Sequence, residues 1–172
     1  MYKSLLVLLG VSLLIDAKLI RDNKKEVVLD TNTNLMWQDD KDIIKEVKKI
    51  WLLAPKNIRK CEGKYEKKDE KKCFDTSGDT ADTYCKKLTL GGYKDWRLPT
   101  INELTTIVDK NNSPTINSAF KNKSGDLYWF LWSISTNPKK QNEALAIDFD
   151  TGDIVSFTKA TMLYIRCVRD NK

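Results

Sequence analysis

The stretch GGYKDWRLPTINEL, residues 91–104, constrains the fold of this chain more than any other part of it. Its two leading glycines can take the left-handed backbone conformations that end a helix, which suits the amphipathic run before them. After the turn, Trp96 and Leu98 alternate with Arg97, so the first two are expected in the core and the arginine at the surface. The stretch therefore predicts a helix stop followed by an extended segment with a buried aromatic side chain.

The second half of the stretch predicts a helix start. Pro99 favours an extended conformation for the residue before it and cannot donate a backbone hydrogen bond. Thr100 and Glu103 form a capping box, in which a hydroxyl and a carboxylate accept hydrogen bonds from free backbone N–H groups. The helix should span 101–109, and the guanidinium of Arg97 is expected to anchor the turn through the carboxylate of Glu103.

Apolar periodicity and turn residues predict the other elements. Trp37 is expected in the core, at the end of a hairpin whose turn is rich in asparagine and threonine, after a polar lead-in at 18–25. The predicted elements are hairpin strands at 27–29 and 35–37, an amphipathic helix at 42–51, a helix at 79–89, a strand at 127–135, a hairpin of 143–149 with 154–159, and a final strand at 163–168.

Five groups of residues occur in the order found in one bacterial domain family. WRLPT followed by a helix that contains N-E-L is one of them. The others are VLDTNTNLMWQ at 28–38, Ala81-x-x-Tyr84-Cys85-x-x-Leu88, Tyr128-Trp129 with Ser133-x-Ser135, and Ala146-x-Asp148-Phe149 with Arg166-Cys167-Val168-Arg169. From Glu26 to Arg169 the chain thus resembles the family named after the C-terminal domain of the Legionella collagen-like protein, which is grouped with C-type-lectin-like folds.

This resemblance implies an α+β fold. We expect a single C-type-lectin-like domain at 18–172, with two helices packed on a twisted antiparallel sheet and with disulfide bonds. Asn34 stands where the family usually has glycine, and asparagine tolerates the left-handed conformation of such a turn. Residues 41–78 are longer and more charged than usual in the family, so we treat them as an insertion.

Residues 1–17 are typical of a secretory signal peptide. Lys3 is followed by the apolar run 5–15 and by the small residue Ala17. The apolar run is too short for a comfortable membrane span, and an interfacial anchor that is not cleaved is the alternative. No later segment is apolar enough to span a bilayer, so we expect a periplasmic protein, or one secreted or held at the bacterial cell surface.

Cysteine usage agrees with export. Cys61, Cys73, Cys85 and Cys167 all follow the signal, and an even number in an exported chain indicates disulfide bonds. Three pairings are possible, and a zinc site is disfavoured because no close pair of cysteines exists. Cys85 with Cys167 resembles the long disulfide of C-type-lectin-like folds, which leaves Cys61 with Cys73 as a local clip.

The charge balance makes acidic partners plausible. The chain has 30 Lys and Arg against 24 Asp and Glu, a formal net charge of +6. Export disfavours nucleic acid as a partner. The candidate ligand-binding residues are Arg59, Lys60, Lys64, Lys67 and Lys68 in the charged insertion, and Trp132 as a stacking residue. Alternatively, the charge run is a solvated surface and Trp132 belongs to the core.

Several kinds of chemistry lack their residues. The chain contains no histidine, which removes Ser-His-Asp and Cys-His nucleophiles and the usual near-neutral general base. With oxidised cysteines, thiol catalysis is removed as well. The acidic run 148–153 lacks the spacing of an EF-hand and is typical of a hairpin turn. We therefore expect no catalytic residues, no metal site and no cofactor.

These observations predict a non-enzymatic, adhesin-like binding module that recognises a glycan or another acidic surface component. The alternative is a structural or assembly protein of the bacterial envelope that binds a protein partner, which an exposed apolar patch would indicate. An enzyme related to the lectin-like sulfatase-activating oxidases is a third hypothesis, and it would need reduced cysteines.

Overall fold

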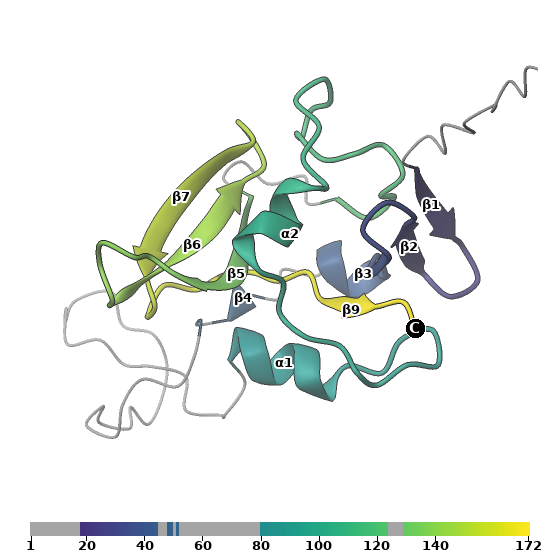
Figure 1. Cartoon of the computed structure of the whole chain (residues 1–172), viewed down its shortest axis with the longest axis horizontal. Coiled ribbons are helices and arrows are strands. Elements are labelled where there is room, and N and C mark those ends of the chain that lie inside the picture. The colour runs from purple at the N-terminus through teal and green to yellow at the C-terminus, as the bar shows by residue number, and fades with distance from the viewer. Residues whose placement is uncertain (1–17, 45–47, 50, 52–79, 124–128) are drawn as a thin grey trace, which may run out of the picture.

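The computed structural model describes residues 18–44, 48–49, 51, 80–123 and 129–172, which form two β-sheets, two α-helices and a 3-10 helix (Figure 1). The first sheet has the order β1-β2-β3-β9, and all of its strands are antiparallel. Its strands are β1 (Leu19–Asp22), β2 (Val27–Asp30), β3 (Leu35–Gln38) and β9 (Val168–Asp170). The β2–β3 hairpin was predicted, and Asn34 takes the expected left-handed conformation with φ +56°. Residues 18–25, predicted as a polar lead-in without a strand, contain β1.

The second sheet has the order β4-β8-β5-β6-β7. It consists of β4 (Lys48–Lys49), β8 (Leu163–Tyr164), β5 (Phe130–Thr136), β6 (Glu143–Asp148) and β7 (Asp153–Thr158). The predicted β6–β7 hairpin is confirmed, and β5 pairs with β8 in parallel. The expectation of a single antiparallel sheet is therefore wrong, although the α+β class is confirmed.

The final strand divides because its middle residues leave the sheet. The predicted strand at 163–168 is instead β8, followed by Ile165–Cys167, followed by β9. We call Ile165–Cys167 the closing segment. It is buried along its whole length and carries the chain from the second sheet to the first. A charged residue, Arg166, lies in the middle of this buried crossing.

The helices are shorter than predicted. Helix α1 spans Ala81–Lys87, and Thr80 caps it. The left-handed Gly91 and Gly92 do not end this helix; they form the turn between Leu90 and Tyr93, which exchange two backbone hydrogen bonds.

Helix α2 spans Ile101–Thr105 and begins at the predicted capping box. It ends early because the hydroxyls of Thr105 and Thr106 donate hydrogen bonds to the carbonyls of Asn102 and Glu103, at 2.7 and 2.8 Å. Backbone bonds three residues apart follow, so the helical turn tightens and stops.

Two apolar clusters lie on opposite faces of β5. The first includes Trp129 and Leu131 and extends to Leu104 of α2, while the second includes Trp132 and extends to Cys85 of α1. Figure 1 shows β6 and β7 at one end of the molecule and β1 and β2 at the other, with β9 beside β3. Apolar side chains thus cover both faces of β5.

The predicted amphipathic helix at 42–51 is wrong. The described part of this stretch contains the 3-10 helix η1 (Lys41–Ile44) and the strand β4. Ile43 packs in the first cluster and Trp51 in the second, so these two apolar residues serve two cores and do not lie on one helical face.

Candidate functional site

The Trp96–Thr100 turn connects the two sheets. The backbone of Arg97 exchanges two hydrogen bonds with Val168 of β9, at 2.8 and 2.9 Å. The carbonyl of Pro99 accepts a hydrogen bond from the backbone N–H of Ile134 in β5, at 2.7 Å. Trp96 beside them is 2% exposed, as expected of a core residue.

The side chains of this turn confirm the predicted anchor. Arg97 donates two hydrogen bonds to the carboxylate of Glu103, at 2.9 and 2.7 Å, and a third to Asp170. Glu103 also accepts the backbone N–H of Thr100, at 2.7 Å. Burial favours a higher pKa for Glu103, but the hydrogen bonds from Arg97 and Thr100 outweigh it and lower this pKa.

Two other elements, α1 and β3, hold the closing segment in place. The predicted disulfide between Cys85 and Cys167 is present, with Cα atoms 5.5 Å apart, and joins the segment to α1. Gln38 of β3 pairs with Cys167 through its backbone N–H and its side-chain oxygen. The other predicted pair, Cys61 with Cys73, lies outside the described residues.

Arg166 of the closing segment belongs to a buried ionic junction centred on Asp39. Both side chains are fully buried, and the Arg166 Nη1 atom lies 3.1 Å from the Asp39 Oδ1 atom. Arg21 pairs with the second carboxylate oxygen, also at 3.1 Å. The backbone N–H groups of Lys121 and Asn122 donate to the same carboxylate, at 2.9 and 3.1 Å. The junction therefore holds the loop at 120–123 against the first sheet.

Burial shifts the pKa values of two groups near this junction. Desolvation lowers the pKa of the Arg166 guanidinium, whose positive charge Asp39 partly stabilises. Desolvation raises the pKa of Asp40, and the charge of Asp42 raises it further, although a hydrogen bond from Gln38 opposes the shift. The sequence analysis missed both aspartates. The charged partners of Asp39 are distant in the chain, and the contact of Asp40 with Gln38 belongs to no recognised motif.

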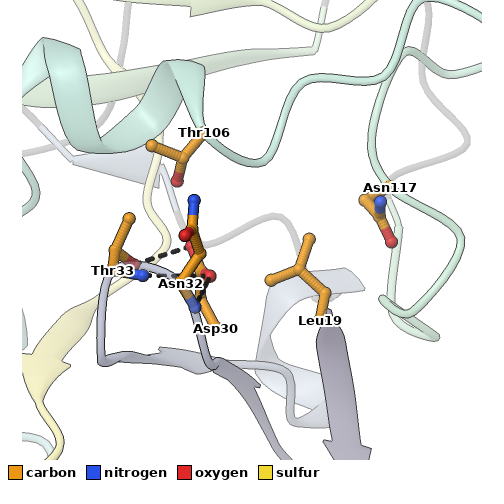
Figure 2. Close-up of a pocket in the computed structure, with 6 residues that line it drawn as sticks. All are labelled: Leu19, Asp30, Asn32, Thr33, Thr106 and Asn117. Atoms are coloured by element: carbon orange, nitrogen blue, oxygen red, sulfur yellow. Dashed lines mark hydrogen bonds between the residues drawn. The ribbon is translucent and has the colours of Figure 1, made fainter. Parts of the chain in front are cut away.

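A polar hollow of about 370 Å³ lies beside the β2–β3 turn. Figure 2 shows it between the start of β1, this turn, the end of α2 and the loop that follows α2. Its lining residues are Leu19, Asp30, Asn32, Thr33, Thr106 and Asn117. In Figure 2, Asn32 and Thr106 point toward each other on one side of the hollow, and Asn117 stands on the other side beyond Leu19.

The lining of the hollow retains unused hydrogen-bonding capacity. Within the described part of the chain, no residue hydrogen-bonds to the side-chain amide of Asn32. Asn117 uses its amide oxygen to accept the N–H of Ala119, at 3.0 Å, which leaves its two amide hydrogens for a ligand. Thr106 donates its hydroxyl hydrogen to Glu103 and retains its oxygen lone pairs as acceptors. The hollow therefore offers donors and acceptors side by side.

The sequence analysis placed the ligand elsewhere. Trp132 is fully buried, with its ring edge-on to Phe157 and their centroids 6.3 Å apart, so it has no open face for a sugar. The expected stacking role is thus corrected, because both faces of β5 are core. The basic candidates Arg59, Lys60, Lys64, Lys67 and Lys68 lie outside the described residues. The residues of the hollow were missed because they come from four separated segments, so no single stretch of the sequence displays them together.

The described residues contain no group of three His, Cys, Asp or Glu side chains that could hold a metal ion. Two carboxylates of the predicted hairpin turn at 148–153 have protein partners. Asp148 accepts the backbone N–H of Asp150, and Asp153 pairs with Lys110 at 2.8 Å.

A known protein family matches most of the chain. The model of the family described as the Lcl C-terminal domain matches residues 26–169, and no curated protein matches the chain. This range contains the Trp96–Thr100 turn, the cysteine pair that joins α1 to the closing segment, and the hairpin that borders the hollow. Because the match spans most of the chain and includes these features, the chain belongs to the Lcl C-terminal domain family.

Proposed function

We propose that this protein is an exported, non-enzymatic binding module, adhesin-like, that recognises a glycan. The observation that carries the proposal is the hollow beside the β2–β3 turn, where amide and hydroxyl groups with unused hydrogen-bonding capacity surround the side chain of Leu19. Sugar hydroxyls both donate and accept hydrogen bonds, and the C–H groups of a sugar ring pack on apolar side chains. The lining matches these two properties.

The expected affinity of such a site is low. Four net hydrogen bonds at about 1 kcal/mol each correspond to a dissociation constant of about 1 mM. An adhesin that uses sites of this strength would gain its overall affinity from several copies bound to one surface.

The envelope-protein alternative has weaker support. The large apolar side chains that the described residues expose are Ile20, with 46% of its surface open, and Ile154, with 53%. They lie on β1 and β7, which belong to different sheets and stand at opposite ends of the molecule in Figure 1. Two separate side chains do not form the continuous patch that a protein interface would use.

Export is part of the proposal. A disulfide between Cys85 and Cys167 agrees with an oxidising compartment, such as the periplasm or the outer surface of a bacterium. Among the helices of the described residues, none combines the length and the apolar character needed to cross a membrane.

Binding of the oxidised domain, residues 18–172, to an array of neutral and sulfated glycans tests the proposal. We expect binding to at least one glycan class. A variant with Lys64, Lys67 and Lys68 changed to glutamine separates two modes, since loss of salt-sensitive binding to sulfated chains would assign the ligand to the charged insertion. Binding to no glycan on the array would contradict the proposal and favour a protein partner in the envelope.

A further inference from the structure

We infer that the hollow selects an uncharged sugar ring of the hexopyranose type and disfavours sulfated and carboxylated sugars. The inference rests on the proposed glycan-binding function and goes further, because it assigns the ligand class and the residues that recognise it. The hollow would then prefer neutral ligands, whereas the charged insertion is expected to prefer acidic ones.

The charge of the lining supports this selectivity. Asp30 is the charged member of the six lining residues, and no lysine or arginine is among them. Asp30 is 5% exposed, and its carboxylate is fixed by its own turn. It accepts the backbone N–H groups of Asn32 and Thr33, at 2.9 and 3.3 Å, and the hydroxyl of Thr33 at 2.7 Å. A sulfate or carboxylate in the hollow would meet this negative charge without a cation of the lining to balance it.

The arrangement of donors and acceptors suits vicinal hydroxyl groups. The amide of Asn32 can donate and accept at once, and the facing oxygen of Thr106 accepts (Figure 2). Across the hollow, the amide hydrogens of Asn117 can donate to a second hydroxyl of the same ring. Leu19, partly buried against the first apolar cluster, supplies the apolar surface between these groups.

The size agrees with a small ligand. The volume of about 370 Å³ is near the lower end of the range of about 300–1,000 Å³ for ligand sites. One sugar ring with a few water molecules fits this volume, and the open side leaves room for the rest of a chain.

A titration followed by ¹⁵N NMR tests the inference directly. The probes are methyl α-mannopyranoside, methyl β-glucopyranoside and methyl β-galactopyranoside, with glucose 6-sulfate and methyl β-glucuronide as anionic counterparts. We expect at least one neutral glycoside to shift the side-chain amide resonances of Asn32 and Asn117, and the anionic probes to bind roughly fivefold more weakly per negative charge.

Three variants sharpen the test. Asn32→Ala should weaken binding of the neutral glycoside about fivefold, as expected for one lost hydrogen bond. Asn142→Ala is the matched control, because Asn142 is an exposed asparagine beside β6 and does not line the hollow. Asp30→Asn should reduce the discrimination against anions, because it removes the negative charge of the lining. The turn should be retained, since the new amide oxygen can still accept the N–H groups of Asn32 and Thr33.

The outcomes separate this inference from the proposed function. If glycans bind on the array while the resonances of Asn32 and Asn117 do not move with any neutral glycoside, the inference is overturned and the proposed function remains. Anionic probes that bind the hollow as tightly as neutral ones would overturn it as well. If no glycan binds anywhere, both statements fail.

Discussion

The Trp96–Thr100 turn and the closing segment perform the same task by different physical means. Both connect the two sheets, and both use an arginine paired with a carboxylate. In the turn, Arg97 and Glu103 are six residues apart and their side chains are 37% and 21% exposed. In the closing segment, Arg166 and Asp39 are 127 residues apart and fully buried.

This difference decides how much each pair contributes to stability. An exposed pair is screened by water and salt, so it contributes little beyond its geometry. A buried pair has lost its hydration, so each partner depends on the other, and removal of one leaves an uncompensated charge. The pKa shifts follow this rule: burial lowers the pKa of Arg166, whereas the hydrogen bonds that Arg97 donates to Glu103 raise the pKa of Arg97.

The largest expected effect is the loss of the disulfide that holds the closing segment. Cys85 and Cys167 are separated by 82 residues, so the bond removes much of the conformational entropy of the unfolded chain. The double variant Cys85→Ala/Cys167→Ala should lose about 4–5 kcal/mol of unfolding free energy. Urea unfolding monitored by tryptophan fluorescence measures it, and a loss below about 1 kcal/mol would contradict the prediction.

The next effect is at the buried ionic junction. Asp39→Ala should lower the unfolding free energy by about 3–5 kcal/mol, because Arg166 keeps a buried charge and two backbone N–H groups lose their acceptor. Asp39→Asn keeps one acceptor oxygen and should lose less. The losses should be nearly the same at low and at high salt; a loss that disappears in about 1 M NaCl would show that the junction is accessible to solvent.

The same comparison explains which parts of the fold the sequence could predict. The capping box of Thr100 and Glu103, the hairpin turn at Asn34 and the anchor of Arg97 all depend on residues that are close in the chain. Such features can be recognised within a short stretch of the sequence. The exception is the pair of glycines, which take the expected conformation but belong to the turn after the helix.

Long-range features escaped prediction. Arg166, between the two parts of the divided final strand, pairs with Asp39, and nothing in the sequence marks Asp39 as its partner. The burial of Trp132 depends on apolar residues that cover it, and many of these lie far from it in the chain. The pairing of Cys85 with Cys167 was predicted because the family resemblance supplied the long-range information.

A smaller effect is expected at the Trp96–Thr100 turn. Glu103→Ala removes both the partner of Arg97 and the acceptor of the Thr100 N–H, so it should lose about 1–2 kcal/mol. Glu103→Gln is the matched variant, because glutamine retains the capping acceptor and removes the charge. It should lose less than about 1 kcal/mol, and salt should reduce this loss. Equal losses for the two variants would show that the cap contributes nothing.

The pH dependence of this loss has a definite sign. The pKa of Glu103 is lowered in the folded protein, so its charge stabilises the fold above the pKa of the unfolded chain. This contribution is lost as the pH falls through the folded pKa. The difference in unfolding free energy between the natural chain and Glu103→Gln should therefore shrink in acid, and a difference that grows there would contradict the assignment.

The smallest expected effect has the opposite sign and comes from Asp40, next to the buried junction. Its pKa is raised above the ordinary value of 3.8, mainly by burial, so the unfolded chain releases this proton before the folded protein does. Stability is then lost as the pH rises, because the fold must hold a poorly hydrated charge. Asp40→Asn removes that charge and should raise the unfolding free energy by about 1 kcal/mol or less near neutral pH.

The gain should disappear below pH 3.8, where Asp40 is protonated in both states. Asp42→Asn is the comparison variant, because it removes a neighbouring charge that raises the pKa of Asp40. It should raise the unfolding free energy by a smaller amount. Unfolding by urea at several pH values measures both. A gain that persists in acid would mean that burial of the Asp40 charge is not its cause. The charges that affect stability in this region would then be those of Asp39, Arg21 and Arg166 alone.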